Sequence, residues 1–369
     1  MLIDRRLITH INWGLLATLF ALFFVGVLNL YSASGVRLED GLSLSSFYQR
    51  QLVWGGCGTL TMLCVMSFDY KRLTNISTLF YGLVLLLLLM VPLFGKIVYG
   101  AKRWLDLGFF QLQPSEFAKI AVLILGAQLL AQDASPLSWT KLAKILCVGL
   151  VPTAFILCQP DLGTSLTLLF ILSGMILYHG IRPAVFKTCL VIIPLLLPLG
   201  WFAMHDYQKQ RILTFLDPSN DPLGAGYHIT QSQIAIGSGQ FWGKGFLQGT
   251  QSQLRFLPEK HTDFAVAVFG EEWGFIGCVG LLLLYCLFLL AIFNTVRSAK
   301  DRFGSTLAAG VFVYFFWQIL INMGMVLGLM PVVGIPLPFM SYGGSATLLN
   351  FALAGLVLNI SMRRFIFKS

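Results

Sequence analysis

Four ionisable residues lie beside apolar stretches, where a charge costs free energy unless it has a partner or a chemical task. Glu116 and Lys119 are three positions apart at the start of one such stretch, so a helix places them on one face. Asp161 stands at the end of another apolar stretch, and Asp263 comes directly before a third. A carboxylate partly removed from water has a raised pKa, which makes it a better general base.

Each of these residues also has a structural interpretation. We expect Lys119 to pair with Asp161 and Glu116 to point into the same cavity, and such a buried pair can serve only to fix the register of two helices. Asp263, or Thr262 before it, can simply cap the helix that follows. On the residues alone the structural and chemical roles both stay open, and for Asp263 they are compatible.

A metal site has little support in the sequence. Three histidines lie near one another in the chain with Asp206, but the spacing of His205, His228 and His261 fits no compact ligand motif. We therefore interpret them as solvent-facing loop residues and expect no tightly bound cofactor. Mg²⁺ or Mn²⁺ held loosely between carboxylates and a substrate diphosphate would leave no signature, so the metal requirement stays unknown.

Basic residues in the same parts of the chain could neutralise a phosphate-bearing substrate. Attraction to anionic lipid head groups is the alternative. The candidates for binding a substrate diphosphate are Lys102, Arg103, Arg211, Lys244, Arg255 and Lys260.

The composition identifies the class of protein that must position these groups. Of the 369 residues, 57% are hydrophobic and 11% are charged, whereas globular domains carry about 25% charge. The apolar residues form repeated blocks close to the ~20 residues that cross a bilayer, so the chain is predicted to be a polytopic membrane protein. The net charge of +9 is scattered over loops, which argues against nucleic acid as a partner.

The expected fold is all-α, a single domain over residues 1–369 with about ten transmembrane helices. The eighth span is too long for one straight crossing, so we expect it to start within the membrane surface at Asp263 or to break near residues 271–274. A long extracytoplasmic loop, residues 205–263, separates the seventh and eighth spans. The expected spans are about 11–32, 51–68, 76–95, 116–132, 143–158, 162–179, 184–204, 264–295, 306–330 and 343–362.

The basic residues predict the orientation of the chain. An even number of spans puts both termini on one side, and the loops of that side are far richer in Lys and Arg, which is typical of the cytoplasm. The short loops of the other side carry only Arg37, Arg50, Lys96, Lys102 and Arg103. That outer side also receives the 96–116 loop, the 159–161 turn, the 205–263 loop and the glycine- and proline-rich 331–344 loop.

Several stretches, in this order along the chain, resemble one known family. They are residues 102–108 (KRWLDLG), 113–119 (QPSEFAK), 159–165 (QPDLGTS), 217–228, 249–264 and 331–345. From about residue 100 onward the chain is similar to the SEDS family (shape, elongation, division and sporulation), while the first hundred residues match only in hydropathy. The runs GTQSQ (249–253) and LPEKHTDF (257–264) favour the rod-shape branch of the family over the division branch.

The resemblance implies a ten-helix peptidoglycan glycosyltransferase of the bacterial cytoplasmic (inner) membrane. Such an enzyme polymerises lipid II during cell elongation, beside a class B penicillin-binding protein that cross-links the glycan and other proteins of the elongation complex. The family's essential aspartate falls on Asp263, its conserved Glu and Lys on Glu116 and Lys119, and its paired Asp on Asp161. Asp263 would be the general base of an inverting transfer with a lipid diphosphate as leaving group.

Two other functions compete with this one. A flippase for lipid-linked precursor would also use intramembrane Glu116, Lys119 and Asp161 and a broken helix near Gly274. Against it, the distinctive residues gather on the outer face and no inverted repeat is visible. A scaffold that only holds a partner enzyme would not need a carboxylate at Asp263.

Overall fold

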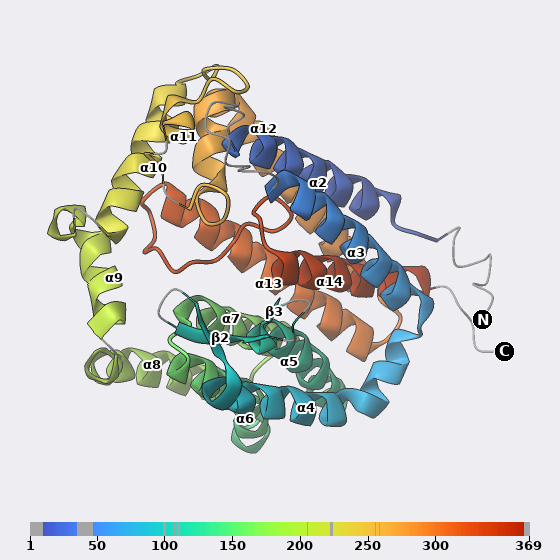
Figure 1. The fold of residues 1–369 in the computed structure, drawn as a ribbon. Helices are drawn as coiled ribbons and strands as arrows, with labels where there is room; N and C mark the ends of the chain where they lie inside the picture. The colour runs from blue at the N-terminus through green and yellow to red at the C-terminus, as the bar shows by residue number, and fades with distance from the viewer. Residues whose placement is uncertain are drawn as a thin grey trace.

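The computed structural model describes residues 10–34, 47–98, 101–106, 108, 111–204, 206–221, 224–254, 256–257 and 259–364. It is a bundle of long helices (Figure 1). These helices are α2 (Trp13–Ala33), α3 (Phe47–Ser67), α4 (Leu73–Phe94), α5 (Pro114–Ala131), α6 (Trp139–Cys158), α7 (Leu162–His179), α8 (Pro183–Ala203), α12 (Ala265–Ser298), α13 (Arg302–Val326) and α14 (Gly344–Met362).

The protein is an all-α polytopic membrane protein. Among the described helices, eight are long and apolar enough to cross a membrane: α2, α4, α5, α6, α7, α12, α13 and α14. Helices α3 and α8 occupy the other two predicted spans but are not among the eight, so the predicted count of ten is not confirmed.

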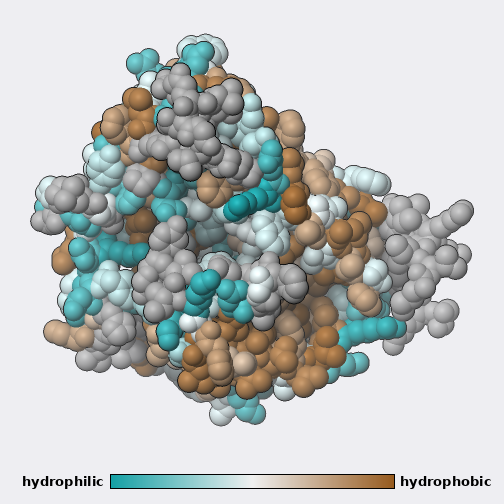
Figure 2. Space-filling view, viewed as in Figure 1, coloured by the Kyte–Doolittle hydropathy of each residue, from teal (hydrophilic) through white to brown (hydrophobic). Residues whose placement is uncertain are grey.

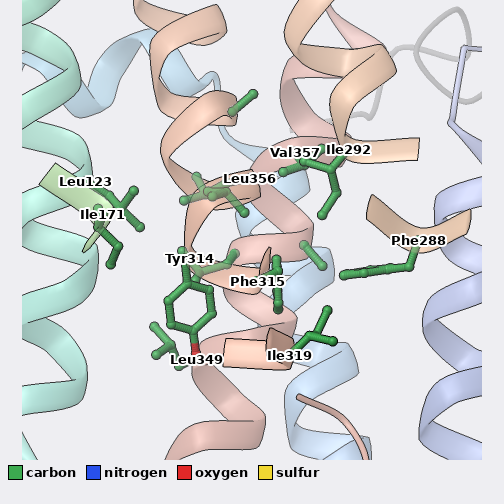
Figure 3. Close-up of a cluster of buried hydrophobic side chains, with 14 of the residues drawn as sticks. Leu123, Ile171, Phe288, Ile292, Tyr314, Phe315, Ile319, Leu349, Leu356 and Val357 are labelled. Atoms are coloured by element: carbon green, nitrogen blue, oxygen red, sulfur yellow. The ribbon is translucent and has the colours of Figure 1, made fainter. Parts of the chain in front are cut away.

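The core of the bundle is formed by α5, α13 and α14, which lie in the middle of Figure 1 and are buried along most of their length. Their apolar side chains interlock with those of α7 and α12, as the close-up in Figure 3 shows for Leu123, Ile171, Phe288, Phe315 and Leu349. Helices α2, α4 and α12 instead expose much of their apolar surface. A bundle in lipid has this pattern because the outward faces remain in contact with hydrocarbon.

One end of the bundle gathers basic residues. Asp301 caps α13 there by accepting a hydrogen bond from the Gly304 amide at 2.8 Å, and it forms an ion pair with Lys71 at 3.3 Å. Arg363, at the end of α14, donates to the Met66 carbonyl of α3 at 3.3 Å. The start of α13 and the ends of α3, α12 and α14 therefore meet at this end, and the 159–161 turn and the 331–344 loop lie at the other.

Two predicted loops contain regular structure. The first contains a small antiparallel sheet with strand order β1-β2-β3, made of β1 (Lys96–Val98), β2 (Ala101–Asp106) and β3 (Gln111–Leu112). The 205–263 loop contains α9 (Asp206–Leu216), a 3-10 turn (Pro218–Asn220), α10 (Ala225–Gly239) and α11 (Thr250–Gln253). Helix α10 packs on α12 and α13, and its Ser232 hydroxyl donates to the Val326 carbonyl at 2.9 Å.

The predicted break in the eighth span lies at Gly274, inside α12. Its φ of +62° is a conformation that only glycine adopts readily. The break frees backbone groups, and the segment after α10 satisfies them. Lys244 and Gly245 amides donate to the carbonyls of residues 271 and 272 at 3.0 Å, while the amides of residues 275 and 276 donate to carbonyls of residues 240 and 241. Broken helices persist within membranes when protein groups supply such partners.

Candidate functional site

A pocket of about 660 Å³ opens between the small sheet, α5, α7, the residues before α12 and the 331–344 loop. In Figure 2 a hollow lies near the centre of the face seen in Figure 1, with hydrophilic side chains around it. The four residues singled out from the sequence, Glu116, Lys119, Asp161 and Asp263, all line this pocket. Residues almost 150 positions apart in the chain are thus brought into one cavity.

Asp263 does not cap the helix that follows it. Phe264 is the N-cap of α12, and no side chain makes a capping hydrogen bond there, so the capping interpretation is wrong. The Asp263 side chain lines the pocket and is partly buried. This burial, reinforced by the negative charge of Glu259 and opposed by Arg211, raises the pKa of Asp263 to about 6. A carboxylate of this pKa is ionised at neutral pH and is a stronger base than an exposed aspartate.

Lys119 forms its ion pair within its own helix. Its ammonium lies 2.6 Å from Glu116 Oε1 and 5.7 Å from the centre of the Tyr314 ring, which is within cation–π range. The predicted pair with Asp161 is therefore wrong: over the described residues, Glu116 is the acidic partner of Lys119. Three positions on one helix bring the two side chains together without help from a second helix. Glu116 Oε2, also buried, has no hydrogen-bond partner in the described part of the chain.

Asp161 is held by the start of its own helix instead. It caps α7 by accepting hydrogen bonds from the Thr164 amide at 3.2 Å and the Thr164 hydroxyl at 2.9 Å, and Gln113 lies 3.5 Å away. Arg103 on β2 donates to the carbonyl of Gln159 at 3.3 Å and to that of Pro160. The sheet thereby holds the 159–161 turn against the pocket.

The predicted phosphate-binding residues separate into three groups. Arg103 lines the pocket, and Arg211 on α9 is close enough for its charge to be felt by Asp263. Burial and repulsion from Arg103 lower the pKa of Arg211, while Asp263 and Asp161 act in the opposite direction.

Of the four remaining candidates for phosphate binding, three do not line the pocket, and the fourth lies outside the described residues. Lys102 is exposed and contacts the Pro92 carbonyl at 3.3 Å. Lys244 forms an ion pair at 2.7 Å with the fully buried Glu271 beside the break in α12. Lys260 is not among the residues that line the pocket, and Arg255 lies outside the described residues.

The histidines do not behave as solvent-facing residues. His261 is half-buried, lines the pocket and stacks on Phe47 with ring centres 4.4 Å apart. Burial and the charge of Lys260 lower its pKa to about 4, so it is neutral at pH 7. His228 stacks on Phe264, and His205 lies outside the described residues. Over the described chain no three His, Cys, Asp or Glu side chains converge well enough to hold a metal ion.

Sequence reasoning missed several polar residues that shape the pocket. Gln51 on α3 is fully buried and hydrogen-bonds to the 331–344 loop, Gln318 lines the pocket, and Asn322 on α13 donates to the Asp263 carbonyl. All three stand inside predicted apolar spans. A polar residue there is expensive in the same way as a charge, so the same signal could have found them.

The pocket combines a carboxylate, positive charge and aromatic rings. Asp263 can accept a proton, and Lys119 and Arg103 supply positive charge. Aromatic rings of Phe47, Trp54, Trp104 and Tyr342 also line the cavity. Apolar surface with a few convergent polar groups is typical of small-molecule sites.

Comparison with known proteins decides the family. The family model for FtsW, RodA and SpoVE, described as cell cycle protein, matches residues 13–365. The chain belongs to this family. The resemblance seen in the sequence is thereby confirmed, and with it the multi-pass bacterial membrane protein.

Relatives match over nearly the whole chain. The peptidoglycan glycosyltransferase MrdB of Escherichia coli (strain K12) is 40% identical over 358 residues, covering 96% of this chain and 94% of that protein. The peptidoglycan glycosyltransferase RodA of Treponema pallidum (strain Nichols) is 35% identical over 431 residues, covering 97% and 99%.

Solved structures share the fold. A chain of a peptidoglycan synthase complex, described as coordinating polymerization and crosslinking, superposes with a TM-score of 0.81 at 32% identity, covering 96% of this chain and 98% of that one. The crystal structure of the rod shape determining protein RodA of Thermus thermophilus gives a TM-score of 0.70 at 29% identity, covering 97% and 98%.

Proposed function

We propose that this protein is a peptidoglycan glycosyltransferase that polymerises lipid II into glycan strands during cell elongation, with Asp263 as its general base. Family membership and the glycosyltransferases MrdB and RodA among the relatives support the activity. The observation that carries the assignment of the base is the position of Asp263. It lines the charged pocket, makes no helix cap, and has its pKa raised to about 6.

The chemistry follows from the weakness of a sugar hydroxyl as a nucleophile. Asp263 takes the proton of the 4-hydroxyl on the acceptor's N-acetylglucosamine as that oxygen bonds to the anomeric carbon of the donor. The bond from this carbon to the donor's lipid diphosphate breaks, and the diphosphate departs from the opposite face, so the configuration inverts. A diphosphate is already a good leaving group, so the second carboxylic acid that glycosidases use is not needed.

Positive charge at the pocket stabilises the departing diphosphate. Lys119 and Arg103 line the cavity, and Arg211 acts on it from α9. We propose that Mg²⁺ or Mn²⁺, where the reaction uses it, binds mainly to the substrate diphosphate, because the described carboxylates and histidines do not converge into a cage.

The partner and the orientation are also part of this proposal. A cross-linking transpeptidase, a class B penicillin-binding protein, is the expected partner, supported by the likeness to a chain of a peptidoglycan synthase complex. The basic end of the bundle, which carries Lys71, Arg302 and Arg363, would face the cytoplasm. The pocket at the other end would then open toward the outer leaflet.

The experiment that tests the function uses the wild-type protein with its transpeptidase in vesicles that contain fluorescent lipid II. Formation of glycan polymer on a gel supports the glycosyltransferase. Lipid II that crosses the bilayer without polymer would support the flippase, and neither product would support the scaffold. A transpeptidase inhibitor keeps the glycan uncross-linked and readable.

Arg211 provides a test of the leaving-group site. Arg211→Gln is expected to lower kcat/KM for lipid II at least about tenfold, because a hydrogen bond to a charged group contributes about 1.5–3 kcal/mol. Since the Arg211 charge lowers the pKa of Asp263, its removal also moves the acidic limb of the pH profile upward. Lys102→Gln is the matched control, because Lys102 is exposed and outside the pocket. Equal effects of the two substitutions would contradict the assignment.

A further inference from the structure

The segment just before α12 is fixed through three consecutive backbone carbonyls, those of residues 261–263. The Tyr342 amide donates to the first at 2.8 Å. The Ser341 hydroxyl donates to the second at 2.6 Å. The Asn322 side chain on α13 donates to the third, that of Asp263, at 3.0 Å. The two peptides before the Asp263 side chain and the one after it are therefore each oriented by a separate donor.

These donors belong to one connected structure. Asn322 also donates to the Ile335 carbonyl at 2.8 Å, so one amide group joins Asp263 to the 331–344 loop. Within this loop Ser341 accepts a hydrogen bond from the Leu337 amide at 2.9 Å. The fully buried Gln51 of α3 donates to the Ser341 carbonyl at 3.3 Å. The position of Asp263 is thus tied to two helices, α3 and α13.

The Asp263 carboxylate itself lies against this loop. Gly334 has a φ of +75°, and a Cβ added to it would lie 3.4 Å from Asp263 Oδ2. Ile335, the residue after Gly334, has the backbone carbonyl that accepts a hydrogen bond from Asn322. Asn322 therefore fixes both the backbone of Asp263 and the surface on which its carboxylate rests.

The burial of Asn322 is costly. The side chain is 0% exposed, and its carboxamide oxygen has no hydrogen-bond partner among the described residues. An unsatisfied buried amide oxygen destabilises a fold, because the group loses its hydrogen bonds to water without replacement. An apolar residue would avoid this cost but would supply neither hydrogen bond.

We infer that Asn322 is a positioning residue for the glycosyl transfer proposed above, acting through the Asp263 and Ile335 carbonyls and not by contact with substrate. This inference rests on Asp263 being the general base. A displacement of about 1 Å of a reacting group can cost about 10²-fold in rate. We expect that loss of the Asn322 hydrogen bonds lets the Asp263 peptide shift by a distance of about 1 Å.

Asn359 offers a matched control. It is a buried asparagine on α14 whose amide also donates to two backbone carbonyls, those of Val65 and Phe68, at 2.6 and 2.5 Å. It lies at the basic end of the bundle, away from the pocket. Asn322→Leu and Asn359→Leu each remove two hydrogen bonds from a side-chain amide to backbone carbonyls. Asn359→Leu also removes the one that its side-chain oxygen accepts from Arg363, and only Asn322→Leu touches Asp263.

The test measures lipid II polymerisation by each variant, purified with the transpeptidase, as kcat and KM per folded molecule. Asn322→Leu is expected to lower kcat about 10²-fold with KM changed less than threefold. Asn359→Leu is expected to stay within twofold of the wild type in kcat, although both variants unfold at lower temperature. A merely structural Asn322 would reduce the amount of folded protein without this difference in kcat.

Equal kcat values for the two variants overturn the inference. If Asn322→Leu does not fold, Asn322→Asp keeps the size of the side chain and replaces the amide nitrogen that donates both hydrogen bonds with an oxygen. A kcat less than threefold below wild type for this variant then overturns the inference. Asp263→Ala in the same assay separates the two proposals. An active Asp263→Ala enzyme defeats the proposed base, whereas an inactive one beside a fully active Asn322 variant defeats only the positioning role.

Discussion

Asp263→Asn is expected to lower kcat for glycan polymerisation by about 10²–10⁴-fold, which is the range that general bases contribute. Asparagine has the size of aspartate and makes no carboxylate, so the change removes the proton acceptor and little else. The Asp263 carbonyl keeps its hydrogen bond from Asn322, which does not depend on the side chain. KM and the thermal unfolding temperature are therefore expected to stay close to those of the wild type.

The control for this substitution lies in the same segment, residues 205–263. Asp217 is an exposed carboxylate that hydrogen-bonds only to Ser219 among its described contacts, at 3.1 Å to the amide and 2.6 Å to the hydroxyl. Asp217→Asn is expected to leave kcat within about twofold of wild type. A kcat for Asp263→Asn as high as that of Asp217→Asn would show that Asp263 is not the base.

Lys119→Met is expected to reduce the free energy of unfolding by roughly 3–5 kcal/mol, because it leaves the Glu116 carboxylate buried without its cation. The two side chains are 5% and 10% exposed, and their atoms lie 2.6 Å apart. Thermal unfolding in detergent and protein abundance in membranes measure the loss. Activity per folded molecule should fall as well, because the Lys119 ammonium lines the pocket.

An exposed ion pair provides the comparison. Lys96 and Asp106 lie 3.1 Å apart with 58% and 40% of their side chains exposed, and exposed pairs of this kind contribute little to stability. Lys96→Met should therefore change the unfolding temperature little. Normal abundance and stability of Lys119→Met with lost activity would instead mean that Lys119 serves only the chemistry.

The general architecture was predictable because hydrophobic blocks of membrane-spanning length leave few alternatives. The helices follow the predicted spans closely, and the break in α12 was expected because Glu271 and Glu272 precede a glycine in an overlong span. The residues of the pocket were found because charges beside apolar stretches are costly. The family resemblance then identified Asp263 among them.

The pairing of those charges could not be predicted from the chain alone. Lys119 can reach Glu116 on its own helix or a residue from another helix, and only the packing of α5 against α7 and α13 decides. Asp161 instead caps α7, a local role that its position before Leu162 also allowed. The helices inside residues 206–253 escaped notice because their moderate polarity suggested a surface loop.

The hydrogen bonds that hold the segment around Asp263 could not be predicted for a different reason. Asn322, Ser341 and Tyr342 follow Asp263 in the chain by roughly 60 to 80 positions, and they act through backbone carbonyls. Every residue has a backbone carbonyl, so the sequence does not indicate which carbonyls accept these hydrogen bonds. Only the folded 331–344 loop shows which residues hold the base.

The measurement that tests the central claim most directly is the pH dependence of kcat for the wild type and for the residual activity of Asp263→Asn. A base must be ionised, and burial raises the pKa of Asp263 to about 6, so wild-type kcat should be level above that pH and fall as the pH drops through it. In Asp263→Asn this acidic limb should be absent. A limb of the same position and depth in both proteins would contradict the role of Asp263 as the base.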